Sequence, residues 1–377
     1  MIWFNPFDRR EKFFVLLIAP EKVSAVLFAV TRDRIMSCEK FWPDFDLSSS
    51  SRWWPKILPH WNVVVAASPN LAYTAHVSFQ LEREHGEKTP LSFPELENLL
   101  SRGMNQEFIR YRKIASQALG VSDLDTVLAD SRIIDFKIDG HRVHNPITFS
   151  PKQLHAAVEI TFIHRQLYES LRNLIRRQNF FFTSSAQAKL TTLQKAYSAP
   201  FALAVLESPH SALFQVVSSD LGNDYRRHDL AWSAKEFLEV FIETWGVNEE
   251  IARDLYRLHE KGMLPKSSEA HVAKRFKEIS ERLDASLKSV SASGTILVTS
   301  QEEIPFTSKK FTFQKISLPT LLEKMGFTAV GDNWPVADYE RFSYIAPLLD
   351  FFSDQGSQEI NRWLRRRLHW LGSMNYN

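Results

Sequence analysis

The sequence predicts an α/β protein built from two related lobes, and three observations support this prediction. A strand, a tight turn and a second strand over residues 13–30 recur over residues 201–217, roughly 190 positions later. Long helical patterns follow the second copy. The 377 residues, 44% hydrophobic and 24% charged, are enough for two or three globular units with ordinary cores.

The elements before residue 200 follow from local patterns. Apolar runs and alternation predict strands over residues 13–18, 23–30, 61–67, 131–138 and 156–162. A helix is expected over residues 91–119, because Ser92 can cap it and Glu95 stands three positions later. A basic amphipathic helix is expected over residues 166–177. Residues 183–190, rich in Ser, Thr, Ala and Gln, are expected to be a polar connector.

The second half continues with strands and three helices. Strands are expected over residues 201–206, 211–217 and 295–299. Helices are expected over residues 233–245, 248–261 and 272–290.

Composition excludes several classes of site. The 12 glycines include no G-x-G, which excludes the dinucleotide fingerprint and a kinase-type glycine loop. Gly326 and Gly331 are followed by Asp332-Asn333 and so form no P-loop. The single cysteine, Cys38, excludes internal disulfides and cysteine-based zinc sites. A net charge of +2 gives no general attraction to nucleic acid, and no apolar run reaches the ~18 residues of a membrane span.

One stretch points to a family. Residues 138–154, Ile138-Asp-Gly-His-Arg-Val-His-Asn-Pro-Ile-Thr-Phe-Ser-Pro-Lys-Gln-Leu154, resemble the I-D-G…N-P…S-G-x-x-L stretch that ends the inserted subdomain of FtsA-like bacterial division actins. Residues 17–23 and 205–211 stand where that family carries its two phosphate hairpins, D-I-G-[ST]-x-K-V and D-I-G-G-G-T-[ST]. Residues 297–305 match the adenosine motif L-T-G-G-G-S-E-L-P, and residues 344–349 resemble the closing helix.

The resemblance implies an actin-like (ribonuclease H-like) two-lobed α/β fold with an inserted α+β subdomain of the SHS2 type. It implies the following order: first lobe 11–70, inserted subdomain 71–162, first lobe again 163–200, second lobe 201–232, its helical subdomain 233–290, second lobe and closing helix 291–353, and an amphipathic tail 354–377.

The departures from the family motifs concern the nucleotide site. Leu17 and Val205 stand at the positions of the two aspartates that organise metal and water in actin-like ATPases. The glycines that let backbone N–H groups approach phosphate are also replaced. The degenerate nucleotide-site positions are Ala19, Pro20, Lys22, Glu207, Ser208, Ser300 and Gln301. We therefore expect a pseudo-ATPase without cofactor, metal or catalytic residue; the alternative is an ATPase that binds ATP-Mg through substituted residues, with Glu207 as the replacement carboxylate.

Residues 358–371 predict an amphipathic helix. Its apolar residues share an arc of about 160°, while arginines occupy much of the opposite face, with Asn361 and His369. Tryptophan together with arginine suits a helix lying in an anionic membrane surface, and FtsA-like proteins end in such a helix. The expected membrane-binding residues are Ile360, Arg362, Trp363, Leu364, Arg365, Arg366, Leu368, Trp370 and Leu371. The alternative is a terminal helix packed on the body.

The resemblance also implies a protein partner. FtsA-like proteins receive the C-terminal peptide of FtsZ on the helices that correspond to residues 248–288. The basic residues there are Arg253, Arg257, Lys274, Arg275 and Lys277, which acidic neighbours dilute, so an ordinary solvated face is the alternative. The expected function is a non-catalytic division scaffold that tethers FtsZ-type filaments to the inner face of the cell membrane, strengthened by self-association. The alternatives are a PilM-like scaffold of type IV pilus assembly or the ATPase above.

Overall fold

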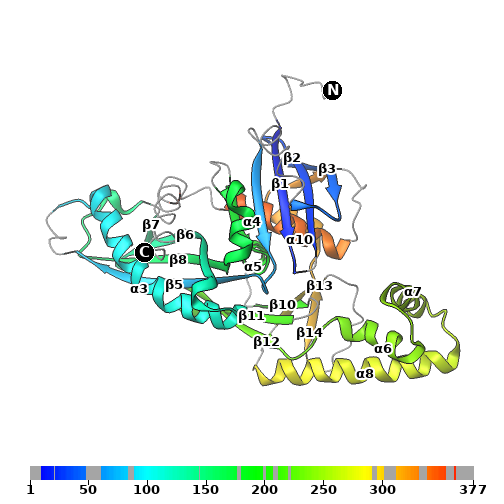
Figure 1. Cartoon of the computed structure of the whole chain (residues 1–377). Helices are drawn as coiled ribbons and strands as arrows, with labels where there is room; N and C mark the ends of the chain where they lie inside the picture. Colours follow the sequence, from blue (N-terminus) through cyan, green and yellow to red (C-terminus); the bar gives the residue numbers. More distant parts are fainter. Residues whose placement is uncertain are drawn as a thin grey trace.

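The computed structural model describes residues 10–20, 22–47, 61–83, 89–143, 145–175, 180–197, 201–206, 211–219, 222–290, 295–300, 311–330, 338–353 and 361. These residues form two mixed sheets, a third antiparallel sheet, and the helices that separate or cover them (Figure 1).

The first lobe is a six-stranded sheet. Its strands are β1 (Glu11–Ile18), β2 (Val23–Val30), β3 (Ile35–Trp42), β4 (Asn62–Ala67), β9 (Phe180–Ser184) and β15 (Thr328–Val330). They lie in the order β15-β3-β2-β1-β4-β9. β1 pairs antiparallel with β2 up to Ile18 opposite Val23, and parallel with β4, so the predicted first hairpin is confirmed.

The second lobe repeats this arrangement. Its strands are β10 (Phe201–Leu206), β11 (Ser211–Ser219), β12 (Gly222–Leu230), β13 (Thr295–Ser300) and β14 (Thr312–Lys315). They lie in the order β12-β11-β10-β13-β14, which matches β3-β2-β1-β4-β9 strand for strand. β10 is likewise antiparallel to β11 and parallel to β13. The predicted internal repeat is therefore a repeat of topology.

Two helices lie between these sheets: α5 (Ser185–Ala196) and α10 (Asp338–Ser353). A single apolar core joins Val15 of the first sheet, Leu203 of the second and Leu348 of α10. The predicted polar connector over residues 183–190 is wrong, because those residues end β9 and form the first half of α5, and all of them are buried. A helix enclosed on all sides needs no apolar stripe, provided that its polar groups find partners.

The third sheet lies to one side of the lobes (Figure 1). Its strands are β5 (Ala72–Glu82), β6 (Thr126–Ile138), β7 (His141–Val143) and β8 (Gln153–His164), in the order β5-β8-β6-β7. The long helix α3 (Phe93–Leu119) packs on it, and the predicted cap is confirmed, since the Ser92 side chain accepts from the Glu95 N–H. The chain returns to the first lobe through α4 (Arg165–Ile175).

Three helices extend the second lobe: α6 (Lys235–Trp245), α7 (Glu249–Glu260) and α8 (Lys266–Ser289). α8 begins at Lys266, directly after Pro265, rather than at the predicted Val272. Their apolar faces share a core with β10, β11 and β13. The short α9 (Leu318–Lys324) leads to β15. Within the described part of the chain, no helix is both long enough and apolar enough to cross a membrane.

Candidate functional site

The turn of the first hairpin is the place to which the sequence resemblance assigns a phosphate-binding loop. Here the Ala19 N–H donates to the Lys22 carbonyl at 2.9 Å, and the Lys22 N–H donates back to the Ala19 carbonyl at 3.3 Å. Pro20 between them has no N–H. The described residues of this turn therefore offer no backbone donor to an anion, because the hairpin uses the two N–H groups that they carry.

The two positions that would carry metal-organising aspartates, Leu17 and Val205, are apolar residues in apolar surroundings. Val205 is 1% exposed and lies in the core shared by both lobes. Leu17 is partly buried and packs against the same core. Neither position supplies a carboxylate for Mg²⁺. No group of three His, Cys, Asp or Glu side chains that could hold a metal occurs among the residues that the structure describes.

Of the remaining predicted nucleotide-site positions, the structure describes Lys22 and the backbone of Ser300. The Lys22 ammonium is half-exposed, with its Nζ 4.0 Å from Asp44 Oδ1. Ser300 ends β13, opposite Leu206 in β10. Glu207, Ser208 and Gln301 lie outside the described residues. Whether Glu207 replaces a lost carboxylate thus stays a prediction.

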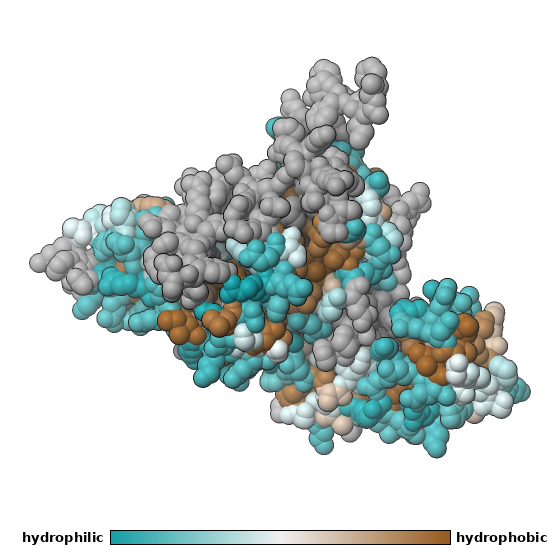
Figure 2. Space-filling model, viewed as in Figure 1, coloured by the Kyte–Doolittle hydropathy of each residue, from teal (hydrophilic) through white to brown (hydrophobic). Residues whose placement is uncertain are grey.

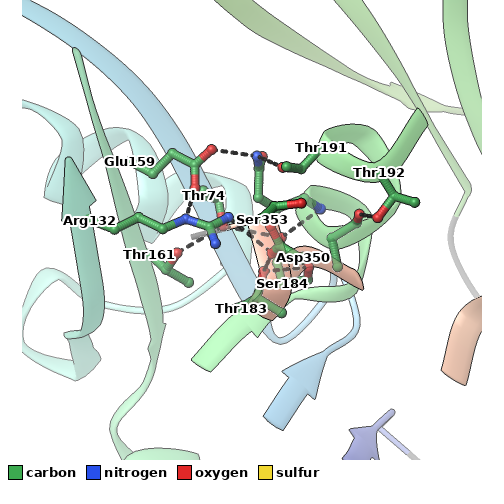
Figure 3. A network of polar contacts seen from close by, with 12 residues as sticks. Thr74, Arg132, Glu159, Thr161, Thr183, Ser184, Thr191, Thr192, Asp350 and Ser353 are labelled. Atoms are coloured by element: carbon green, nitrogen blue, oxygen red, sulfur yellow. Dashed lines mark hydrogen bonds and ion pairs between the residues drawn. The ribbon is translucent and has the colours of Figure 1, made fainter. Parts of the chain in front are cut away.

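A buried polar network lies where the third sheet meets the first lobe (Figure 3). Arg132 in β6 is its centre: Nη2 donates to Asp350 Oδ2 of α10 at 3.0 Å, and Nε donates to Glu159 Oε2 of β8. Thr183 at the end of β9 donates to the same Asp350 oxygen at 3.0 Å. One guanidinium thus joins two paired strands of the third sheet to α10, which lies 218 positions further along the chain.

The network continues through α5. His76 Nε2 donates to Gln187 Oε1 at 2.8 Å, and Gln187 Nε2 donates to Glu159 Oε1 at 2.7 Å. Burial, aided by the Arg132 charge, lowers the pKa of His76 to about 3 against the opposing effect of the Gln187 hydrogen bond. Glu159 lies 3.4 Å from the His76 ring but is already paired with Arg132, so the imidazole stays neutral.

Hydroxyl groups complete the junction. Thr74 Oγ1 of β5 lies 3.0 Å from Thr161 Oγ1 of β8 and donates to Ser184 Oγ at 3.1 Å. The charged groups at its centre pair with one another away from solvent, so the network suits a rigid joint better than a reactive site. Sequence reasoning missed it, although the Ser, Thr and Gln of residues 183–190 were the available signal.

The five basic residues of the expected partner surface lie exposed on α7 and α8. Four of them face carboxylates of their own region: Arg253 with Glu249, Arg257 with Asp254, Arg275 with Glu243 and Glu278, and Lys277 with Glu281. Figure 2 shows hydrophobic residues gathered near α7 and the turn into α8. The exposed apolar side chains of this region are Trp245, Ile251, Leu258 and Met263.

Only one residue of the predicted C-terminal helix is described. Asn361, expected on the solvent-facing polar side, is 0% exposed. Its Oδ1 accepts from the Ile133 N–H at 2.7 Å, and its Nδ2 donates to the Ile133 carbonyl at 3.2 Å. Asn361, which the sequence places on the polar side of the helix, is therefore buried at the edge of β6, and at this residue the structure agrees with the alternative of a terminal helix packed on the body. The expected membrane-binding residues lie outside the described part of the chain.

No family model and no curated protein matches the sequence. Among solved structures, a PilM-PilN type IV pilus biogenesis complex is similar at a TM-score of 0.50 and 11% identity, over 91% of this chain and 98% of that one. A Bacteroides thetaiotaomicron protein with an actin-like ATPase fold is similar at 0.34 and 7%, over 93% and 99%. A ROK family protein from Streptococcus pneumoniae reaches 0.39 and 10%, over 91% and 99%. The repeated sheet order and the likeness to the PilM-PilN structure agree with the fold predicted from the sequence: the chain has the actin-like α/β fold.

Proposed function

We propose that this protein is a non-catalytic actin-like scaffold. The observation that supports this best is the first hairpin, whose two described N–H groups bond within the turn. The apolar Leu17 and Val205 add to it, since a triphosphate brought beside them would lose hydration without gaining a metal carboxylate. A fold that retains both lobes without this chemistry is suited to holding other proteins in place.

A thermal-shift titration with ATP and Mg²⁺ tests the loss of nucleotide binding. We expect the melting temperature to stay constant up to millimolar ATP. Ligand at 100 times its Kd would stabilise the fold by about 2.7 kcal/mol, which raises the melting temperature by several degrees. A shift that requires Mg²⁺ and disappears in Glu207→Gln would establish nucleotide binding through substituted residues and contradict the proposed loss.

The assembly that we favour is the PilM-like one. The likeness to the PilM-PilN complex extends over nearly the whole chain. A resemblance to the PilM-like branch implies that the ligand is the N-terminal peptide of a partner. The FtsZ tether is the second candidate, supported by the Trp- and Arg-rich sequence of residues 358–371.

Fluorescence anisotropy with two labelled peptides separates these candidates. A PilN-type N-terminal peptide is expected to bind the full chain, whereas an acidic FtsZ C-terminal peptide is not. Binding of the FtsZ peptide that is lost in the charge reversal Lys274→Glu with Arg275→Glu, and kept in Lys235→Glu on α6, would reverse this order.

We also propose that residues 357–377 contact an anionic membrane. Vesicle flotation of the full chain and of a chain ending at residue 356 tests this contact. We expect the full chain to float with vesicles containing phosphatidylglycerol and the shortened chain to stay at the bottom. Equal flotation of both would exclude a membrane role for this segment.

A further inference from the structure

The helix α7 carries a stripe of apolar side chains beside the face that it buries. The buried face holds Ala252 and Tyr256. Ile251, Leu255 and Leu258 stand at i, i+4 and i+7, so they lie along one side of the helix. Ile251 is 47% exposed and Leu258 39%, whereas Leu255 packs partly against the core. These three residues form an apolar stripe that the core of the second lobe uses only in part.

The turn after α7 extends the apolar stripe. Gly262 has a φ angle of 63°, and the Met263 N–H donates to the Leu258 carbonyl at 2.9 Å, which places Met263 at the end of the stripe. Met263 is 66% exposed. α7 lies at the outer end of the second lobe (Figure 1), and hydrophobic residues reach the surface there (Figure 2). The stripe is therefore accessible to another molecule.

Charged residues follow one flank of the apolar stripe in a segregated order. Glu250 and Asp254 occupy this flank in the first half of α7, and all the carboxylates of the flank lie there. Arg257 and Lys261 occupy the flank in the second half and at the end of the helix. The four are spaced by three or four positions and are exposed, so they share one accessible side. Such an order is self-complementary, because an antiparallel copy brings the acidic half of one helix opposite the basic half of the other.

One antiparallel alignment satisfies the charged flank and the apolar stripe together. It sets Asp254 opposite Arg257 of a second copy. The same alignment sets Glu250 opposite Lys261 and brings the two Leu255 side chains near the twofold axis. Within one chain, Arg257 Nη1 lies 3.0 Å from Asp254 Oδ1, and this exposed pair is easily exchanged for the equivalent pair between copies.

We propose that two copies of this chain associate through antiparallel α7 helices. A twofold contact of this kind closes on itself and gives a dimer rather than a filament. α7 has 12 residues and is about 18 Å long, so the contact is smaller than the ~800 Å² per partner of a stable interface. The dimer should therefore form at roughly micromolar concentrations. This inference does not depend on the proposed function, although a dimer would give a scaffold two sets of binding sites.

Sedimentation velocity of the full chain at increasing concentrations tests the contact. We expect the natural chain to pass from monomer to dimer, and the double variant Ile251→Ser with Leu258→Ser to associate at least tenfold more weakly. Ile109→Ser is the matched control, because Ile109 is 72% exposed but lies on α3, and this variant should dimerise like the natural chain. A natural chain that stays monomeric at several hundred micromolar, or an equal loss in the control, would overturn the proposal.

Charge reversal tests the antiparallel alignment. Glu250→Lys and Lys261→Glu each set like charges opposite one another, so each variant alone should dimerise several times more weakly. A 1:1 mixture of the two variants restores opposite charges in the mixed dimer and should recover the natural association. The two positions are 11 residues apart on one helix, about 16 Å, so this recovery cannot arise within one chain. A mixture that associates no better than the single variants would contradict the alignment.

A partner protein is the other possible occupant of the apolar stripe, and the same variants identify it. If the natural chain stays monomeric but binds an acidic FtsZ C-terminal peptide, and Ile251→Ser with Leu258→Ser loses that binding, the stripe belongs to the peptide. That result would replace the dimer by a contact with a different protein.

Discussion

Arg132 and Asp350 form a buried ion pair although 218 positions separate them in the chain. Their Nη2 and Oδ2 atoms lie 3.0 Å apart, with side chains 8% and 0% exposed. The pair joins β6 of the third sheet to α10, the helix between the two lobes. Because Arg132 also pairs with Glu159 of β8, one buried side chain holds the third sheet against α10, so the orientation of that sheet does not depend on the linkers alone.

Replacing Arg132 by Met should therefore destabilise the protein strongly. The change leaves the carboxylates of Glu159 and Asp350 buried without their cation, which costs about 3–5 kcal/mol. Urea unfolding gives the free energy. Arg142→Met is the control, because that guanidinium is largely exposed and its pair with Asp135 is worth about 1 kcal/mol or less. Similar losses of unfolding free energy in both variants would show that the buried network stabilises the fold no more than an exposed ion pair does.

His76 predicts a pH dependence of stability. The ring titrates near 6.5 in the unfolded chain and near 3 in the fold, where burial keeps it neutral beside Arg132 and Glu159. Its contribution is complete above pH 6.5 and declines as the pH falls toward 3, because only the unfolded chain takes up the proton. Between pH 7 and pH 5 the free energy of unfolding should fall by about 2 kcal/mol from this group.

The contribution of His76 is isolated by comparison with His76→Gln. Unfolding curves of both proteins at pH 7 and pH 5 give the two differences. The natural chain should lose about 2 kcal/mol more than the variant. Parallel losses would mean that the ring is accessible to protons in the fold.

Introducing at Val205 the aspartate that actin-like ATPases carry should destabilise this protein instead of activating it. In Val205→Asp a charge enters the apolar core shared by the two lobes, at an expected cost of about 3 kcal/mol or more. Val205→Thr, similar in shape and uncharged, should cost about half as much or less. Chemical unfolding with and without Mg²⁺ gives the free energy of unfolding of both variants. If Mg²⁺ restores the stability of Val205→Asp, this position binds a metal, which would contradict the proposed function.

Gly103 in α3 is expected to resist substitution because of close packing. A Cβ at this position would lie 2.5 Å from Phe79 Cε2 and 3.2 Å from Leu81 Cδ2. Gly103→Ala should therefore cost about 1–3 kcal/mol, although alanine favours helix elsewhere. Shortening the opposing ring in the double variant Gly103→Ala with Phe79→Leu should recover part of this loss. Independent, additive effects of the two changes would contradict the proposed contact.

Much of the fold was predictable because its signals are local. The two hairpins and the cap at Ser92 depend on neighbouring residues only. The loss of the phosphate-binding hairpin was also predictable from the sequence. Pro20 has no backbone N–H to donate to a phosphate, and Leu17 has no carboxylate to organise a metal. By contrast, residues 183–190 were misassigned, because Gln187 and its neighbours are buried by segments that follow or precede them by many residues.

The sequence by itself determined the two hairpins and the long helices, that the two halves are related, and that the phosphate-binding residues are replaced. Only the tertiary structure decided the joint around Arg132 and the docking of Asn361 on β6. The physical reason is that alternation and helical spacing report which side of an element is apolar, whereas a buried polar side chain is acceptable only when a distant partner meets it. Such partners come together when the whole chain packs.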